Sequence, residues 1–248
     1  MNIDFSQCPT PCYIVDERLL EKNLKILQSV QERTGCSILL ALKGFSMFSV
    51  FPLVGHYLKG ITASSLFEAR LGYEEMGKEV HIYSPAYVED EFEEIINYCD
   101  HMIFNSFAQW NLYKERILKS GRSIECGIRI NPEYSEIEIP IYNPCYQNSR
   151  LGVTLKNFNP DELEGIQGLH FHTMCEQNSD TLERTVKVVD EKFGKYISRM
   201  KWINMGGGHH ITRDDYDIDI LVKSILFFKN KYGVDVYLEP GEAIALNT

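Results

Sequence analysis

Short apolar runs alternate along the chain with longer amphipathic segments. Eight runs, each bounded by polar residues or glycine, have the length of buried strands: 38–42, 60–63, 80–83, 101–104, 124–130, 168–172, 202–204 and 234–238. Apolar residues recur at helical spacing most clearly in 17–32, 66–76, 88–98, 107–119, 181–196 and 218–231. This alternation of strands and helices predicts a parallel sheet.

The number of predicted strands favours a closed (β/α)8 barrel, a TIM-type α/β fold, over an open doubly wound sheet. A doubly wound nucleotide-binding sheet would place a glycine fingerprint after its first strand, and the segment 42–45 is not one. A length of 248 residues also suits a barrel, which typically has about 250. We therefore predict one barrel domain over residues 1–248, with a long irregular loop at 131–158.

Composition and charge exclude several classes of protein. With 44% hydrophobic and 24% charged residues, the chain is typical of globular proteins. The net charge is −10 and no basic cluster is present, so we predict no nucleic-acid partner, and the acidity would suit a small cationic substrate. No apolar run reaches the roughly 20 residues of a membrane span, and the N-terminus lacks a signal-peptide pattern, so we expect a cytoplasmic protein. The seven cysteines include no Cys-x-x-Cys motif and predict no disulfide framework.

Candidate functional residues follow the predicted strands directly. In α/β barrels the active site lies at the carboxyl ends of the strands. The polar and glycine residues at those positions are Lys43, Ser64, Arg129, His170, His172, Gly206, Gly207, Gly208, Glu239, Gly241 and Glu242. We expect this set to converge at one end of the barrel.

Several of these residues have an ordinary and a functional interpretation. Lys43 has its ammonium group in water, or it lies in the barrel mouth, where burial favours a neutral amine that forms a Schiff base. The glycines 206–208 form a mobile turn, or they let the backbone approach a phosphate group. Glu239 is a solvated turn residue, or its carboxylate pairs with a protonated ring nitrogen.

His172 is a candidate for stacking on a flat ligand, for metal ligation or for a core position. A metal would draw on His170, His209 and His210 with a carboxylate, but these histidines are adjacent or two apart, and no helical His-x-x-x-His occurs. We therefore predict no metal site. Cys175 and His172 are a less favoured nucleophile and base pair, and no Gly-x-Ser-x-Gly motif is present.

A carbonyl-reactive lysine, phosphate-binding glycines, a flat histidine and a ring-facing carboxylate together suit pyridoxal 5'-phosphate. Nine short segments also occur in the same order as in one enzyme family. They are 10–13, 40–45, 63–68, 129–132, 142–145, 149–153, 170–172, 204–209 and 239–243. Through them the chain resembles the alanine-racemase-type (fold type III) pyridoxal-phosphate enzymes. Among these it is more similar to the carboxynorspermidine decarboxylase family than to the ornithine, arginine or diaminopimelate decarboxylases.

The resemblance implies a role for each site residue. Lys43 would be catalytic and would carry the cofactor covalently. The implied cofactor-binding residues are Lys43, His172 on the pyridine ring, Gly206, Gly207, Gly208 and Gly241 on the phosphate, Glu239 on the ring nitrogen and Arg129 nearby. Related decarboxylases carry arginine where this chain has Glu242, and we expect Glu239 and Glu242 to bind the substrate, with Glu242 facing a cationic polyamine tail.

The resemblance also implies decarboxylation of carboxynorspermidine or carboxyspermidine to norspermidine or spermidine, in a homodimer. Family members carry a β-rich domain after the barrel, and we expect residues 1–248 to lack it and to bind cofactor better than they turn over substrate. Three alternatives remain open at this point. They are a non-catalytic barrel for cofactor homeostasis, another fold type III enzyme (a racemase or a diaminopimelate or ornithine decarboxylase), and a metal-dependent barrel hydrolase.

Overall fold

Eight parallel strands close into a barrel in the computed structural model, which describes residue 6 and residues 8–248. The strands are β1 (Ser37–Ala41), β2 (Gly60–Ala63), β3 (Glu79–Tyr83), β4 (His101–Phe104), β5 (Glu125–Asn131), β7 (Gly168–His170), β8 (Trp202–Asn204) and β9 (Asp235–Leu238). Each pairs with the next in this order, and β9 pairs with β1 to close the ring. The predicted TIM-type α/β barrel is confirmed.

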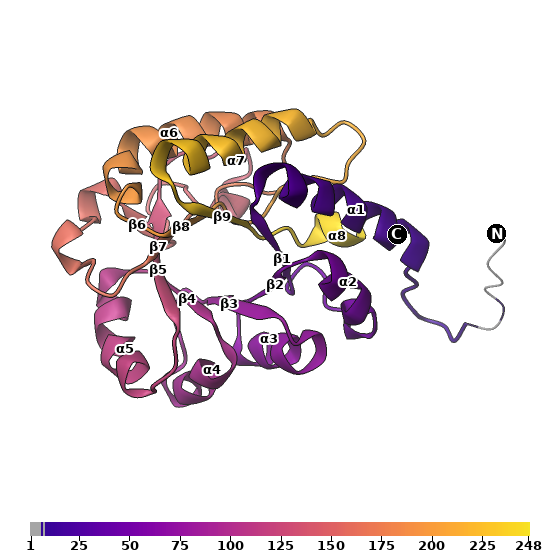
Figure 1. Cartoon of the computed structure of the whole chain (residues 1–248), viewed down its shortest axis with the longest axis horizontal. Coiled ribbons are helices and arrows are strands. Elements are labelled where there is room, and N and C mark those ends of the chain that lie inside the picture. The colour runs from indigo at the N-terminus through magenta and orange to yellow at the C-terminus, as the bar shows by residue number, and fades with distance from the viewer. Residues whose placement is uncertain (1–5, 7) are drawn as a thin grey trace.

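Helices surround the strands (Figure 1). They are α1 (Glu17–Thr34), α2 (Phe51–Tyr57), α3 (Leu66–Leu71), α4 (Phe92–Tyr98), α5 (Phe107–Lys119), α6 (Ser179–Ile197), α7 (Ile218–Tyr232) and the short α8 (Glu242–Ala245). Two of them start almost directly after a strand, because Ser65 and Ser106 cap α3 and α5 by accepting a hydrogen bond from a backbone N–H of the first turn. The sequence pattern missed α2 and α8.

The core between helices and strands is apolar, as the α1 stripe illustrates. Leu20, Leu24, Leu27 and Val30 recur every three or four residues and are fully buried. Each such side chain contributes roughly 2 kcal/mol through burial. This stripe therefore fixes α1 against the barrel and explains why the helix was predictable.

The amino end of the barrel interior is filled by Trp202. The indole is only 2% exposed and packs with Leu39, Ile103 and Tyr237. A Cβ atom on Gly168 would lie 2.0 Å from the indole ring, and one on Gly127 would lie 2.3 Å from it. Glycines on two neighbouring strands thus make room for one large side chain, and this packing leaves the open space at the carboxyl end.

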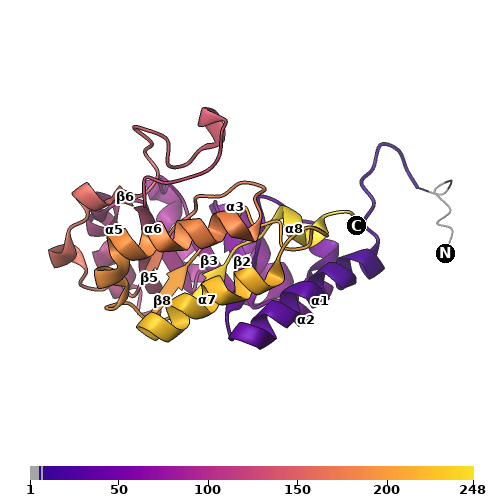
Figure 2. The same ribbon diagram turned by 90° about the horizontal axis from the view of Figure 1, so that it is seen from above.

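The predicted irregular loop at 131–158 is not wholly irregular, so that prediction is wrong in part. It contains the strand β6 (Val153–Thr154), which pairs with the end of β5, and the 3-10 turns Pro140–Tyr142 and Leu155–Asn157. Figure 2 shows the segment between β5 and β6 standing out from the barrel. Two residues are too short a strand to give a periodic signal.

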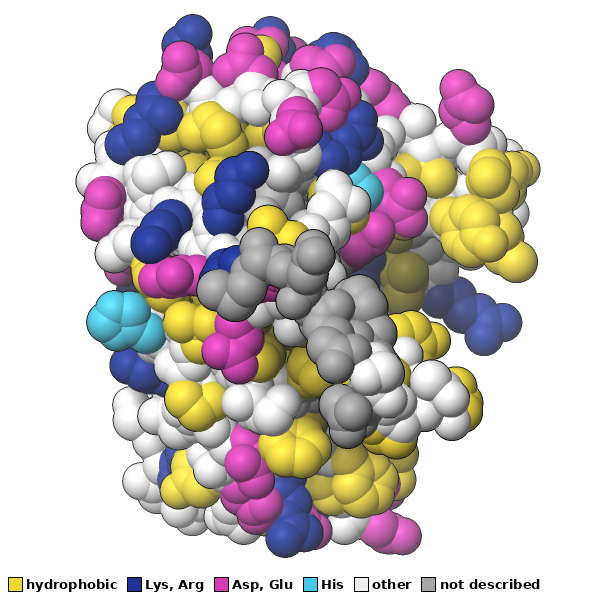
Figure 3. All heavy atoms as spheres, turned by 90° about the vertical axis from the view of Figure 1, so that its right-hand side faces the viewer, with side chains coloured by type: hydrophobic (Ala, Val, Ile, Leu, Met, Phe, Trp, Pro, Cys, Tyr) yellow, Lys and Arg dark blue, Asp and Glu magenta, His cyan; other side chains and the backbone are white. Residues whose placement is uncertain are grey.

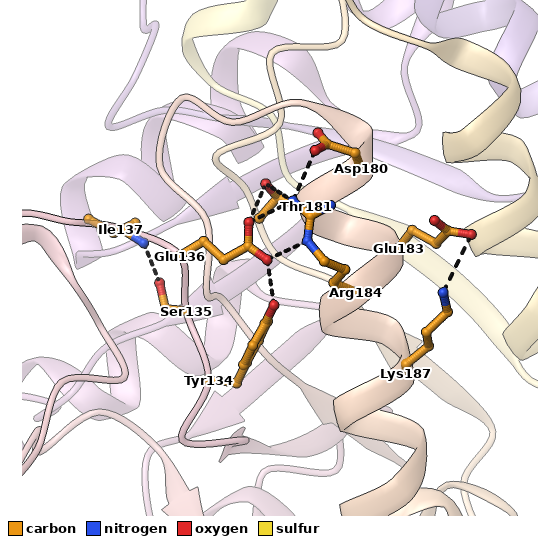
Figure 4. A network of polar contacts seen from close by, with 9 residues as sticks. All are labelled: Tyr134, Ser135, Glu136, Ile137, Asp180, Thr181, Glu183, Arg184 and Lys187. Carbon is orange, nitrogen blue, oxygen red and sulfur yellow. Dashed lines mark hydrogen bonds and ion pairs between the residues drawn. The ribbon is translucent and has the colours of Figure 1, made fainter.

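The base of this loop is bonded to α6 (Figure 4). Glu136 accepts hydrogen bonds from Nε and Nη2 of Arg184 at 2.6 and 2.7 Å, from Thr181 at 3.1 Å and from the Tyr134 hydroxyl. The hydrogen bonds from Arg184 lower the pKa of Glu136 to about 2. The loop is therefore anchored near the barrel while its tip lies further out.

Among the described residues no helix combines the length and apolar character needed to cross a membrane. Acidic and basic side chains are interspersed on the face that carries α1 and α2 (Figure 3). The cysteines, from Cys8 to Cys175, are free thiols.

Candidate active site

The carboxyl ends of the strands surround a cavity of about 270 Å³. Its lining includes seven of the predicted site residues: Lys43, His172, Gly207, Gly208, Glu239, Gly241 and Glu242. Arg129 lines an adjoining cavity of about 580 Å³, which shares Lys43 and His172 with the first and reaches the outer loop. Gly206 is buried beside the first cavity without lining it.

Glu239 presents a buried carboxylate that is 7% exposed. Its Oε1 accepts a hydrogen bond from Asn204 Nδ2 at 2.7 Å, and its Oε2 lies 3.3 Å from His170 Nε2. Burial alone would raise the pKa of Glu239, but the hydrogen bond with His170 and the nearby charge of Lys43 hold that pKa well below its usual range. Glu239 is therefore an ionised group with a fixed orientation.

The two histidines at the end of β7 are shifted toward their neutral forms. Burial lowers the pKa of His170, and burial together with the Lys43 charge lowers the pKa of His172 well below its usual value. The backbone N–H of Gly207 donates to His172 Nδ1 at 2.9 Å, so the proton of the neutral ring is on Nε2. His172 thus offers a flat, uncharged ring to the cavity.

The glycine turn 206–208 places backbone atoms, without side chains, at the cavity. Gly206 and Gly208 have φ of +68° and +83°, a region that favours glycine. A Cβ on Gly208 would lie 2.1 Å from the carbonyl oxygen of Met174. The N–H of Gly206 donates to Asn204 Oδ1, but those of Gly208 and Gly241 donate to no other described residue. These two N–H groups are available to an anion.

Arg129 is held by an aromatic ring that the sequence analysis missed. Its guanidinium lies 4.7 Å from the centroid of the Tyr83 ring and donates to the carbonyl oxygen of His172 at 3.2 Å. Tyr83 in turn donates its hydroxyl hydrogen to Asn105 Oδ1 at 2.8 Å. Because Tyr83 ends β3, the same rule that identified Lys43 would have identified it.

The edge of the cavity is acidic. Glu242 is about half exposed, and its Oε2 lies 3.3 Å from Nε2 of the buried His210. Glu176, which was not predicted, lines the same cavity, and ligand atoms of the three side chains lie within 4.8 Å of one another. The histidine set considered for a metal, with His170 and His209, does not come together as one such group in the part of the chain that the structure describes.

Comparison with known proteins gives a consistent result, although no protein-family model matches the chain. The chain is 47% identical to a carboxynorspermidine/carboxyspermidine decarboxylase from Campylobacter jejuni, over 98% of this chain and 63% of that protein. It is 40% identical to a carboxyaminopropylagmatine decarboxylase from Synechocystis, over 100% of this chain and 64% of that protein.

Solved structures extend the comparison. The crystal structure of carboxynorspermidine decarboxylase from Campylobacter jejuni, complexed with norspermidine, has a TM-score of 0.87 and 46% identity over 95% of this chain and 60% of that chain. A diaminopimelate decarboxylase from Helicobacter pylori has a TM-score of 0.77 at 19% identity, covering 97% of this chain and 65% of that chain, a likeness of fold alone.

The fold is a TIM-type α/β barrel, and over nearly its whole length the chain is similar to decarboxylases. The resemblance seen in the sequence is confirmed: the chain is a homologue of the carboxynorspermidine decarboxylases. It spans about 63% of the length of the first curated relative that it matches.

Proposed function

We propose that this chain is the cofactor-binding barrel of a pyridoxal-phosphate-dependent decarboxylase that acts on carboxynorspermidine or carboxyspermidine. One observation carries the proposal: Lys43, Glu239 and the Gly207–Gly208 turn line a single cavity. An amine, a carboxylate and a backbone anion site in one place match the three polar parts of this cofactor.

The residues present fit pyridoxal phosphate. The turn that would hold the phosphate has room for glycine but not for a side chain, because a Cβ atom on Gly208 would lie 2.1 Å from the carbonyl oxygen of Met174. Lys43 would bind the cofactor covalently, the N–H groups of Gly208 and Gly241 would hold its phosphate, and Glu239 would bind its ring nitrogen. The neutral ring of His172 would lie against the flat face of the cofactor.

When bound, the cofactor supplies an acceptor for the electron pair that remains on the substrate α-carbon after carbon dioxide leaves. The task of Glu239 is to keep a proton on the ring nitrogen, and its lowered pKa suits it because an ionised carboxylate stabilises that proton. His172 is held neutral and so adds no positive charge that would oppose this proton. Arg129, fixed by Tyr83, supplies positive charge to the adjoining cavity.

The acidic edge supports a cationic substrate. Glu176 and Glu242 place two carboxylates at the cavity, and a polyamine chain carries ammonium groups that would bind between them. A second candidate substrate is carboxyaminopropylagmatine, whose decarboxylase from Synechocystis is 40% identical over the whole chain. Its guanidinium end would suit the same two carboxylates.

The cofactor part of the proposal is tested by visible absorption of the chain mixed with pyridoxal phosphate, followed by borohydride reduction and peptide mapping. We expect a protein-bound absorption band and one reduced adduct, on Lys43, which the Lys43→Ala variant lacks. A spectrum of free cofactor, identical for both proteins, would contradict the proposal. Release of carbon dioxide from carboxynorspermidine, carboxyaminopropylagmatine and diaminopimelate, assayed side by side, then separates the substrates.

A further inference from the structure

The side chain of Asn204 closes a ring of three hydrogen bonds beside the cavity. Its Nδ2 donates to Glu239 Oε1 at 2.7 Å, and its Oδ1 accepts from the Gly206 N–H at 2.8 Å. The backbone N–H of Glu239 donates to the Gly206 carbonyl oxygen at 2.8 Å. Asn204 is 0% exposed. One amide therefore joins the end of β8, the glycine turn and the end of β9.

We propose that Asn204 is a positioning residue that couples the carboxylate at the cofactor ring nitrogen to the turn that holds the cofactor phosphate. The inference rests on the proposed function, because it assigns the carboxylate to Glu239 and the turn to Gly206 and its neighbours. An amide suits this position because it donates and accepts at the same time, whereas an ionised carboxylate only accepts.

Two features make Asn204 the principal anchor of Glu239. The other contact of the carboxylate, with His170 Nε2, is longer at 3.3 Å, and His170 Nδ1 has no hydrogen-bond partner among the described residues. The amide also satisfies the N–H of Gly206, a buried residue with φ of +68°. Without Asn204, a buried donor and a buried carboxylate oxygen would each lose a bond.

The variant Asn204→Asp tests this coupling at nearly constant shape. It places a second carboxyl group against Glu239, where two ionised groups repel each other and one proton is retained by the pair. The matched control is Asn131→Asp. Asn131 is also buried at a strand end, donates to the Leu151 carbonyl oxygen at 3.0 Å and accepts from the Glu133 N–H at 2.8 Å. Its amide makes no hydrogen bond with a carboxylate in the part of the chain that the structure describes.

The measurement is the affinity for 4-deoxypyridoxine 5'-phosphate by calorimetry at pH 6.0 and pH 8.5. This probe keeps the ring nitrogen and the phosphate but lacks the aldehyde, so binding does not depend on Lys43. We expect Asn204→Asp to bind about 10-fold or more weakly than the wild type at pH 8.5, with a smaller difference at pH 6.0, because the shared proton is lost as pH rises. Asn131→Asp should follow the wild type at both pH values.

A swapped pair provides the second variant. In Asn204→Asp combined with Glu239→Gln, the amide and the carboxylate exchange places and the hydrogen bond between them is restored. Binding should be weaker than in the wild type at both pH values, because a neutral amide replaces the carboxylate at the ring nitrogen, but the extra pH dependence of Asn204→Asp should disappear. An Asn204→Asp protein that binds like the wild type at both pH values, or a swapped pair that keeps the pH dependence, overturns the coupling. If the wild type itself binds neither this probe nor pyridoxal phosphate, the proposed function fails and the inference fails with it.

Discussion

A stacked pair of histidines at the amino end of the barrel predicts a measurable loss of stability in mild acid. The rings of His81 and His101 lie 4.0 Å apart with an angle of 9° between them. Glu79 lies 2.7 Å from His81 Nε2 and 3.8 Å from His101 Nε2. Burial and the neighbouring His81 lower the pKa of His101 to about 3, against the opposing attraction of Glu79. His101 is therefore neutral in the folded protein in mild acid.

The magnitude follows from the difference between folded and unfolded states. In the unfolded chain His101 takes up a proton near pH 6.5, whereas in the folded protein it stays unprotonated down to about pH 3. The free energy of unfolding is therefore unaffected by His101 above pH 6.5, and it falls with pH below that value because only the unfolded chain gains the proton. Between pH 6.5 and pH 4.5 the loss is about 2.7 kcal/mol, two pH units at about 1.36 kcal/mol each. Glu79, whose pKa is lowered to about 2, stays ionised in the folded protein across this window.

The perturbation is His101→Phe, which keeps a flat ring beside Trp202 and Tyr237 but cannot titrate. Urea unfolding at pH 7.5 and pH 4.5 gives the loss of unfolding free energy for each protein. We expect the wild type to lose about 2.7 kcal/mol more than His101→Phe, and the exposed control His56→Phe to behave like the wild type. Equal losses in wild type and His101→Phe would refute the reasoning, since the other buried histidines are common to both proteins.

Three further outcomes are expected. Gly208→Ala should weaken pyridoxal phosphate binding about 10-fold or more in a spectroscopic titration, because φ is +83° and the new Cβ would lie 2.1 Å from a carbonyl oxygen. The control Gly77→Ala has φ of +62° but open space around the Cβ, so it should cost about 1 kcal/mol of stability and leave binding unchanged. Glu242→Gln should raise KM for a cationic substrate several-fold, with kcat nearly constant, in steady-state kinetics. Glu136→Gln should lower the stability of the loop anchor by only about 1 kcal/mol, because the bonds of Glu136 to Arg184 are partly exposed. It should speed limited proteolysis of residues 137–152 about 5-fold.

The strands were predictable because buried parallel strands appear as continuous apolar runs. All eight predicted runs correspond to barrel strands, with ends that differ by up to two residues. Helix α2 was missed because Phe51–Tyr57 contains Pro52 and Gly55, residues that usually interrupt a helix. In the structure Pro52 lies in the first turn, where its missing N–H costs nothing.

The sequence predicted only those site residues that directly follow a strand along the chain. Lys43 and Glu239 meet that rule, and both line the cavity. Asn204 lies within a segment that carried the family resemblance, but its role depends on Glu239 from a different strand. That contact requires the register in which Asn204 pairs with His170 and Tyr237, and register between strands is not encoded in the spacing along one chain. Glu176 lies in an irregular segment with no periodic signal at all.

The interior of the barrel separates two groups of buried titratable side chains. Glu239 and His170 lie at the carboxyl end, and His81 and His101 lie at the amino end, with Trp202, Leu39, Ile103 and Tyr237 packed between the strands. Closely packed side chains of this kind hold one packing arrangement. Loss of the His101 titration should change stability in acid without changing cofactor affinity at neutral pH, because His101 is already neutral there and its replacement by Phe changes no charge. If His101→Phe does alter the affinity for pyridoxal phosphate at neutral pH, the packed layer transmits a shift from one end to the other. The residue through which it would pass is Tyr237, because its ring lies 5.4 Å from that of His101 and its backbone pairs with Asn204.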